Sequence, residues 1–548
     1  MIEQLQDEQL AKADLRDQEH LAEERMAWEG LYQEVDRLYP DGAGGFNKSS
    51  PGAPRHDHLF DTTHLTALER FRAAGVAITT PEEVQYIRPR FLDDALNKQR
   101  SVQLWNEQAG KRLYGIRHAL HSGFITAAGE DWDQLGRYGT SPMWADMHPT
   151  GRGMFYRTLH LSECFIDTDF SGLVNRVHRL MCRTAAQWCE LFGMAALTPK
   201  MVKAIEENKP HTEFEVLHVV CPNTDWDKEK IDWRQFPIGS RYLAMDEKIY
   251  LQRKGFHSMP VSVSRHMTSP GEKYGRSPAI KMMPNAKGLQ AMRKIVLRAA
   301  NKAVDPALLF FADNGVTKLV TKPGGLNAGL MSEEGRPLVS RMPGGEQGLP
   351  FAENEAEYER GVIKTAFLEE FFKLLTDPNG RMTTVEVVEV LAKQGVLVRP
   401  FASRYASEKQ HPVSQRELDL CMRNGQLPEL PPEVLEAGAW PLVEYENPLS
   451  AMARAESTGK TMRWLEMLNP LMQVDPTVRD YIDTDEMVAG SAIEIGVNPL
   501  YVRDGAAVAA LRAQRKESEQ APIEADAIAK LAGAGLDTAK ANQISAAA

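Results

Sequence analysis

The chain has 548 residues, of which 43% are hydrophobic and 25% are charged, a balance typical of folded proteins large enough for several cores. This composition excludes a fibrous or wholly disordered protein. The formal net charge of -11 at pH 7 argues against a simple DNA-coating protein, because such proteins neutralise phosphates with a surplus of Lys and Arg. We therefore expect any DNA contact to be local, made by a few basic side chains on an acidic protein.

No run of the sequence approaches the roughly 18 consecutive apolar residues that would span a bilayer, and the N-terminus is acidic where a signal peptide would be basic. We expect a soluble protein, made in a cytoplasm and without a membrane partner. The cysteines are odd in number and form no CxxC pair, which predicts reduced, buried thiols at Cys164, Cys182, Cys189, Cys221 and Cys421.

The first part of the chain alternates helices and loops. Residues 1–38 predict a helix, solvated on one side and lying over a core, and residues 39–58 predict a loop rich in Gly, Pro and Ser. A second helix is expected to begin at a capping residue, Thr62 or Thr63. From about 150 to 270 short β-like runs and one helical piece predict an α+β region with antiparallel strands.

The segment from Tyr274 to Pro306 predicts a helix with two stripes, and Pro278 and Pro284 are expected near helix starts. Four cations share one face at spacings of seven, four and four residues: Lys287, Lys294, Arg298 and Lys302. Apolar residues at spacings of three and four form a seam beside them: Leu289, Met292, Val296, Ala299 and Ala303. Taken alone, the basic stripe is best interpreted as the solvated face of an amphipathic helix.

A Gly- and Pro-rich stretch follows from about 307 to 355 and predicts a small module, because it is too long for an ordinary loop. A helix over 355–375 is expected to return from it, and Thr383 or Thr384 to begin a further helix. The run LVEYENPLS predicts a strand that ends at Pro448. Helices are expected over 449–515, and the Ala-rich end is expected to fray.

Three motifs suggest chemistry but lack a decisive residue. The glycine-rich run 42–49 resembles a phosphate-binding loop, except that Asn47 stands where that motif needs Gly. Ser277 lies in G-R-S-P and not in the G-x-S-x-G of a hydrolase. Ligand-type side chains gather at one helix start, where an exposed turn is the simpler interpretation: His56, Asp57, His58, Asp61 and His64. The sequence thus predicts no catalytic residue, metal or cofactor.

Blocks spread in order from about residue 27 to 515 resemble the head-to-tail connecting, or portal, proteins of short-tailed bacteriophages. The blocks are WEGLYQEVDRLYPD, RHDHLFDTTHLTALERF, RTLHLSECFIDTDFSGLVNRVHRLMCRTAAQWCELFG, FEVLHVVCPN, GEKYGRSPAIKMMPNAKGLQAMRKIVLRAANKAVDPALL, MTTVEVVEVLAKQG and VEYENPLSAMARAE. It is their shared order that makes the resemblance specific. The segment from about 105 to 145 departs from the family pattern, which leaves its structure open.

The resemblance implies an α+β, multi-domain portal fold with a wing, a two-helix stem, a clip and a helical crown, assembled as a ring. Each part of that fold then corresponds to a stretch of this sequence: an N-terminal wing region at 1–285, stem helices at 286–306 and 355–375, a clip at 307–354, a tunnel loop (376–382) with the C-terminal wing part at 376–448, a crown at 449–515 and a flexible tail at 516–548.

The resemblance also implies a structural protein of the virion, which forms the channel at one capsid vertex for DNA packaging and ejection. The implied partners are eleven further copies of the chain, double-stranded DNA, the terminase large subunit, tail or adaptor proteins, and capsid and scaffolding proteins. The cations of the stripe, together with Arg381, become candidates for DNA contact, and the seam becomes a candidate for stem packing. The alternatives are another connector or adaptor component and, less favoured, a DNA-processing enzyme.

Overall fold

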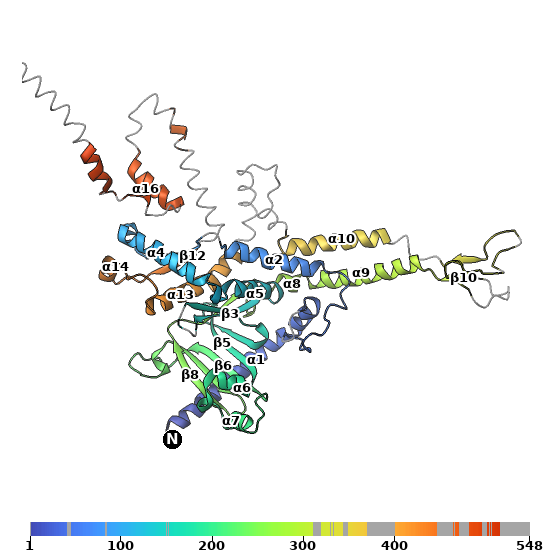
Figure 1. The fold of residues 1–548 in the computed structure, drawn as a ribbon, viewed down its shortest axis with the longest axis horizontal. Helices are drawn as coiled ribbons and strands as arrows, with labels where there is room; N and C mark the ends of the chain where they lie inside the picture. Colours follow the sequence, from blue (N-terminus) through green and yellow to red (C-terminus); the bar gives the residue numbers. More distant parts are fainter. Residues whose placement is uncertain are drawn as a thin grey trace, which may run out of the picture. The chain divides into compact units, whose positions relative to one another are not determined.

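The structure is a computed structural model in which the chain forms two compact units, residues 1–86 with 113–424 and residues 87–112 with 425–548 (Figure 1). The residues it describes are 2–40, 45–82, 85–148, 151, 153–310, 319–328, 330–332, 334–342, 349–369, 401–445, 464, 466–468, 470, 482–495, 501–503, 505 and 507–515. Each unit mixes helices and antiparallel strands, which confirms the predicted α+β class.

The first unit contains a five-stranded antiparallel sheet in the order β4-β5-β6-β7-β8. Its strands are β4 (Cys164–Thr168), β5 (Val174–Thr184), β6 (Glu213–Pro222), β7 (Ile238–Ala244) and β8 (Ile249–Phe256). The β-like runs of the sequence therefore form strands as predicted. The helical piece between β5 and β6 is α6 (Ala185–Phe192), whose first turn is closed by a capping box between Thr184 and Gln187.

The two faces of this sheet are covered by different helices because successive residues of a strand point to opposite sides. Val216 of β6 belongs to a core with Trp188 of α6 and Met201 of α7 (Pro199–Glu206). The next residue, Leu217, belongs to a second core with Ala11 of α1 (Ile2–Leu38). The prediction of an N-terminal helix over a core is therefore confirmed.

A second, three-stranded sheet has the order β3-β2-β9 and lies against helix α5. The region left open by the sequence contains most of α4 (Arg100–Arg117), a short 3-10 turn, α5 (Phe124–Arg137) and the start of β2 (Thr140–Met147). The other strands are β3 (Met154–Thr158) and β9 (Val261–Arg265). Helix α2 (Thr63–Thr79) packs on α5 so closely that a Cβ on Gly75 would lie 2.2 Å from the Trp132 ring.

Helix α2 begins at Thr63, as the sequence predicted, but the expected capping hydrogen bond from a threonine side chain is not the one observed. Thr62 occupies the capping position, but its side chain accepts no hydrogen bond from the first turn. Asp61 does so instead, because its Oδ1 accepts from the Thr63 amide at 2.9 Å. The cysteine prediction also needs a correction. All five thiols are unpaired, yet Cys182 is exposed and Cys189 is only half-buried.

Helices α8 (Pro278–Lys281) and α9 (Met283–Val304) follow, and both carry the expected proline in their first turn. After α9 come the paired strands β10 (Leu308–Phe310) and β11 (Val339–Arg341), and then α10 (Leu349–Ala366). Figure 1 shows α9 and α10 side by side, with β10 beyond their ends. The chain thus runs through a helix, a small module and a returning helix, as the sequence predicted.

The boundaries of these two helices differ from the prediction. Helix α9 ends two residues earlier than expected, and α10 begins at Leu349 and not at Glu355. Pro350 was interpreted as part of a loop, although proline is well tolerated in the first turn of a helix. Helix α10 ends at Ala366 because Leu368 adopts a positive φ of 59° that interrupts the helix. Residues 370–375 lie outside the described residues.

A continuous helical stretch from 401 to 423 ends the first unit. It contains a π-helical segment, Ala406–Gln410, followed by α13 (His411–Arg423). The predicted tunnel loop, Arg381 and the helix expected from Thr383 or Thr384 lie outside the described residues. No helix among the described parts of the chain is both long and apolar enough to cross a membrane.

The second unit is small in its described part. Strand β1 (Ile87–Arg90) pairs with β12 (Leu442–Tyr445), which confirms a strand in the run LVEYENPLS, although residues 446–450 lie outside the described residues. Trp105 in the first part of α4 donates from Nε1 to the Pro428 carbonyl at 3.1 Å and ties this helix to the segment before α14 (Pro432–Ala437). Of the helices predicted over 449–515, α16 (Thr484–Ile495) is described.

Candidate assembly and nucleic-acid interface

The start of the α8–α9 segment is fixed by Ser277. Its hydroxyl oxygen accepts from the Ile280 amide at 2.9 Å and donates to the Arg137 carbonyl at 2.6 Å. Both bonds are structural: they cap α8 and tie it to α5. Ser277 therefore serves as the N-cap that the Ser-Pro pair of the sequence favours.

The four cations of the predicted stripe are all exposed on α9. Two have partners in the same chain: Lys287 forms an ion pair with Glu34 at 2.8 Å, and the Lys294 ammonium lies 5.5 Å from the centre of the Phe60 ring. For Arg298 and Lys302 no ion-pair partner is found among the described residues. The end of α9 that leads to β10 therefore carries unneutralised positive charge.

The predicted apolar seam of α9 faces α10. Leu289 is fully buried and Val296 is 9% exposed, while Met292, Ala299 and Ala303 are half-buried. On the other helix, Ala356 and Ile363 are also fully buried. Their spacing of seven residues places them on one face of α10, which packs against α9. Burial of this seam holds the two helices together as a hairpin within one subunit.

Ion pairs close one edge of this hairpin. Arg293 of α9 lies 3.3 Å from Glu353 of α10, and Arg360 binds Asp61 and Glu357, each at 2.9 Å. The bond from Arg360 to Glu357, together with its bonds to Asp61 and Glu353, raises the pKa of Arg360 and keeps it charged. We name this chain of contacts the ion-pair ladder. This ladder could not be predicted from the sequence, because its members come from three separate segments.

Asp61, in the loop before α2, connects this loop to the ladder through its ion pair with Arg360. Burial alone would raise the pKa of Asp61, but hydrogen bonds from Thr63 and Arg360 outweigh it and lower that pKa. Two of the other ligand-type residues nearby also have partners: Nε2 of His58 and of His64 donate to the carbonyls of Arg37 and Leu38, at 2.6 and 2.7 Å. Among the described residues, no group of three or more His, Cys, Asp or Glu side chains is placed to hold a metal ion.

The glycine-rich run before this loop is likewise tied to α1. The Asn47 amide donates to Oδ2 of Asp36 at 2.8 Å, and the Asn47 side chain donates to the Gln33 carbonyl at 2.8 Å. A carboxylate at this backbone amide opposes the binding of a phosphate there. The described end of the run thus serves as an anchor of the chain on α1.

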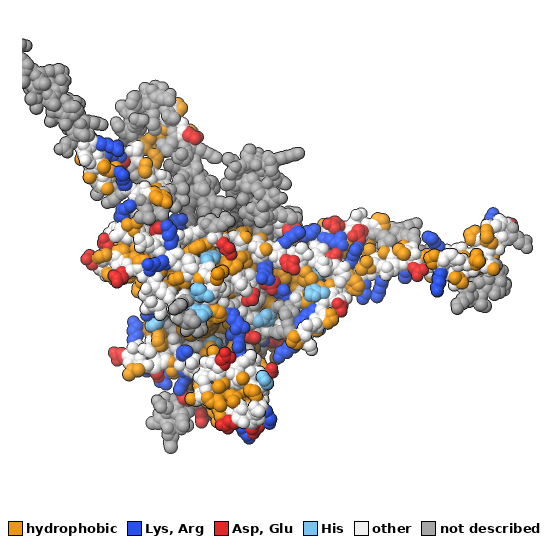
Figure 2. All heavy atoms as spheres, viewed as in Figure 1, with side chains coloured by type: hydrophobic (Ala, Val, Ile, Leu, Met, Phe, Trp, Pro, Cys, Tyr) orange, Lys and Arg blue, Asp and Glu red, His pale blue; other side chains and the backbone are white. Residues whose placement is uncertain are grey.

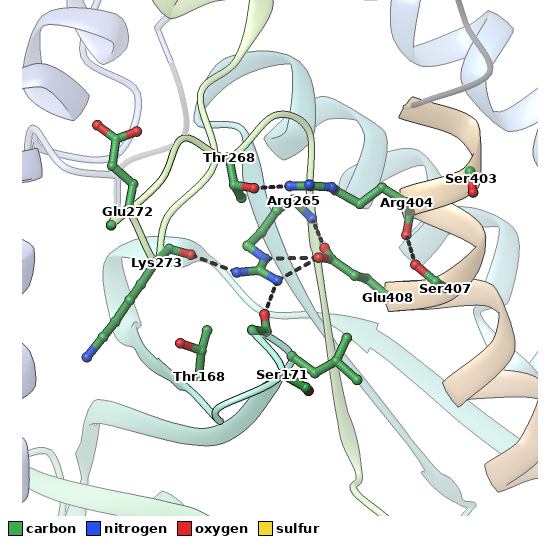
Figure 3. A pocket seen from close by; sticks show the side chains of 13 residues that line it. Thr168, Ser171, Arg265, Thr268, Glu272, Lys273, Ser403, Arg404, Ser407 and Glu408 are labelled. Atoms are coloured by element: carbon green, nitrogen blue, oxygen red, sulfur yellow. Dashed lines mark hydrogen bonds and ion pairs between the residues drawn. The ribbon is translucent and has the colours of Figure 1, made fainter.

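A polar pocket of about 710 Å³ lies where β9, the turn between β4 and β5, and the helical stretch from 401 meet (Figure 3). Arg265 crosses its floor and pairs with Glu408 at 2.6 Å, with further bonds to the carbonyls of Lys273 and Gly172 at 3.2 and 2.6 Å. Arg404 donates to the Thr268 hydroxyl. All three guanidinium nitrogens of Arg265 donate hydrogen bonds within the chain, and these bonds attach the π-helical segment to β9. The residues that line the pocket therefore have a structural role.

Three further charged groups of this helical stretch are buried against the small sheet and its surroundings. Lys409 contacts Asp131 of α5 at 2.7 Å and donates to the carbonyls of Ser141 and Ser262. Two more pairs follow at the next turns: Arg416 with Asp146 at 3.0 Å, and Glu417 with Arg117 at 2.6 Å. Because buried charges require partners, these bonds fix the rotation of the helix on the sheet.

Comparison of the amino-acid sequence with known proteins matches the chain to one family. The family described as bacteriophage head to tail connecting protein matches residues 12–502, most of the chain. The chain belongs to this family. It is 25% identical over 540 residues to a probable portal protein of Bordetella phage BPP-1, an alignment that covers 96% of this chain and 95% of the relative. It is also 24% identical over 458 residues to the portal protein of Salmonella phage epsilon15, covering 81% and 79%.

The family assignment confirms the resemblance found in the sequence. Head-to-tail connecting proteins are structural, so the chain is a structural component and not an enzyme. Portal proteins connect capsid and tail and are components of the virion. The family match spans the α9–β10–β11–α10 segment as well as both sheets, and the alignments cover 95% and 79% of two relatives that are named as portal proteins. This favours a portal function over that of a shorter adaptor.

Proposed function

We propose that twelve copies of the chain form a ring at one capsid vertex, and that the ring is the channel through which DNA is packaged and later ejected. The match to portal proteins over nearly the whole chain is the observation that carries this proposal. The ring would bind the terminase large subunit during filling and tail or adaptor proteins afterwards, within a shell of capsid and scaffolding proteins. The order of helix, small module and returning helix supports the assignment of α9 and α10 to the stem and of the residues between them to the clip.

Imaging of the purified protein tests this function. We expect negative-stain images to show closed rings with a central hole. A contact between two different surfaces of one chain forms a closed ring when a whole number of copies completes one full turn. Mass measurement of the rings should give twelve subunits. A protein that stays monomeric at every concentration, alone and with scaffolding protein, would contradict the proposal.

Within the stem, we propose that Arg298 and Lys302 contact DNA phosphates. Both are exposed and lack an ion-pair partner among the described residues, whereas Lys287 is paired with Glu34 and Lys294 lies over Phe60. Arg381 remains a prediction for the tunnel loop. The acidity of the chain as a whole would limit how strongly passing DNA is retained.

Charge reversal tests these two contacts. Phage carrying Arg298→Glu and Lys302→Glu should assemble rings normally but retain several-fold less DNA, since each lost cation weakens backbone binding and its salt dependence. The measurement is packaged DNA per particle, alongside ring yield. Lys322→Glu, on an exposed residue after β10, is the control for each of the single variants Arg298→Glu and Lys302→Glu, because it changes the charge by the same amount. Wild-type DNA content in the double variant would remove both residues from the list of DNA contacts.

A further inference from the structure

The two flanks of the α9–α10 hairpin differ in whether their side chains have partners within the chain. One flank carries the ion-pair ladder, in which Arg293 forms an ion pair with Glu353, and Arg360, whose side chain is 15% exposed, forms one with Asp61. Residues two positions further along a helix lie about 200° around it. Ile295 and Glu355, each two residues after a member of the ladder, therefore border the opposite flank. We name this opposite flank the open flank.

The open flank exposes large apolar side chains. Phe351 is 74% exposed, Tyr358 is 66% exposed and Ile295 is 63% exposed. On α10, Phe351, Glu355 and Tyr358 follow at spacings of four and three, which aligns them in one stripe. Figure 2 shows hydrophobic side chains reaching the surface along this hairpin, among cations and carboxylates. Aromatic side chains of this kind are enriched at the centres of protein interfaces.

The charges of the hairpin are divided between its two helices. Helix α9 contains five cations and no carboxylate, and α10 contains four glutamates against two cations. Three of the glutamates bind within the chain: Glu353, Glu357 and Glu359. Glu355 has no partner among the described residues, and Lys294 has no carboxylate partner there. A surface with an unpaired carboxylate between two aromatic rings complements a surface with a row of cations.

We infer that the Phe351–Glu355–Tyr358 stripe of one copy binds the surface of α9 formed by Lys294 and Ile295 in the next copy. A second copy fits better than DNA, because a carboxylate between two exposed rings repels a phosphate backbone. The contact joins two different surfaces of the chain, which is the type of contact that builds a ring. This inference rests on the ring of the proposed function and names one of its contacts.

Truncation of the two aromatic residues tests the apolar part of the contact. Phe351→Ser with Tyr358→Ser should raise the protein concentration needed for half-maximal ring assembly by about tenfold or more, as loss of interface hot spots does. Val304→Ser is the matched control: Val304 is 87% exposed, but lies eleven residues from Arg293 and hence on the ladder side of α9. The measurement is analytical ultracentrifugation over a concentration series, with circular dichroism to verify folding.

A charge swap tests the polar part and remains informative if the aromatic variant misfolds. Lys294→Glu or Glu355→Lys alone should weaken assembly several-fold, and the double variant should restore it toward the wild-type value. Equal assembly of the wild-type, aromatic and single-charge variants would overturn the inference while leaving the ring itself intact. Absence of rings in the wild-type protein would instead contradict the proposed function. Weakened single variants with no recovery in the double variant would overturn the pairing of these two surfaces.

Discussion

Arg117→Met should lower the free energy of unfolding by about 3–5 kcal/mol, because removing one partner leaves a buried charge uncompensated. Arg117 is completely buried, and its guanidinium contacts both carboxylate oxygens of Glu417, at 2.8 and 2.6 Å. Tyr156 donates its hydroxyl to the same carboxylate, and Ser414 accepts from the guanidinium at 2.6 Å. Among the described residues, loss of Arg117 would therefore leave the buried Glu417 carboxylate with the Tyr156 hydroxyl as its one remaining side-chain partner.

Two comparisons separate this effect from a general loss of packing. The double variant Arg117→Met with Glu417→Gln removes both charges and should recover most of the lost stability. Lys287→Met breaks an ion pair whose members are 50% and 47% exposed, and should cost less than about 1 kcal/mol. Urea denaturation followed by tryptophan fluorescence measures all three variants. A similar cost for Arg117→Met and Lys287→Met would show that the buried pair contributes little.

The helices and strands could be predicted where the pattern of the sequence is local. The helical piece between the β-like runs and the period of the α9 seam each depend on residues a few positions apart, and both appear in the structure. The start of α10 was missed because Pro350 was weighed as a loop residue. Local patterns therefore gave the order of elements, and the errors fall at the ends of the helices.

The buried charges could not be predicted, because their burial depends on distant partners. Glu408, Lys409 and Gln410 are three consecutive residues of types that are mostly exposed in proteins, yet all three are buried. The ion-pair partners of Glu408 and Lys409 belong to β9 and α5, and Arg117 lies 300 residues from Glu417 in the sequence. A single sequence carries no record of such pairs. The same limit hid the ion-pair ladder, which depends on Asp61 meeting Arg360.

The candidate interface was predicted only in part. Spacing alone identified the exposed cations and the seam of α9, since both are properties of one helix. The exposed apolar residues of the open flank were not recognised, because Phe351 fell in a segment interpreted as loop and apolar residues are by default assigned to a core. The structure reveals them because one flank of the hairpin is closed by ion pairs, whereas the other exposes large apolar side chains.

Acidification from pH 7 to about pH 4.5 should weaken the five-stranded sheet strongly. His178 of β5 and His218 of β6 are buried, where Nδ1 of His178 lies 3.1 Å from Oε1 of Gln18 and Nε2 of His218 lies 2.9 Å from Oγ of Ser240. Burial lowers the pKa of His178 to about 4 and that of His218 to about 3. Both rings are therefore neutral in the folded protein at pH values where an unfolded chain would protonate them.

The sign of the effect follows from proton binding. Below the unfolded pKa of about 6.5 the unfolded chain binds more protons than the folded one, so stability is complete above that pH and is lost as the pH falls toward 4. Each histidine contributes a slope of about 1.4 kcal/mol per pH unit within this window. His218→Gln should flatten the pH dependence of the urea midpoint, whereas His20→Gln, on an exposed residue of α1, should leave it unchanged. An equal slope in the wild type and in His218→Gln would mean that other groups, and not this buried ring, couple the sheet to pH.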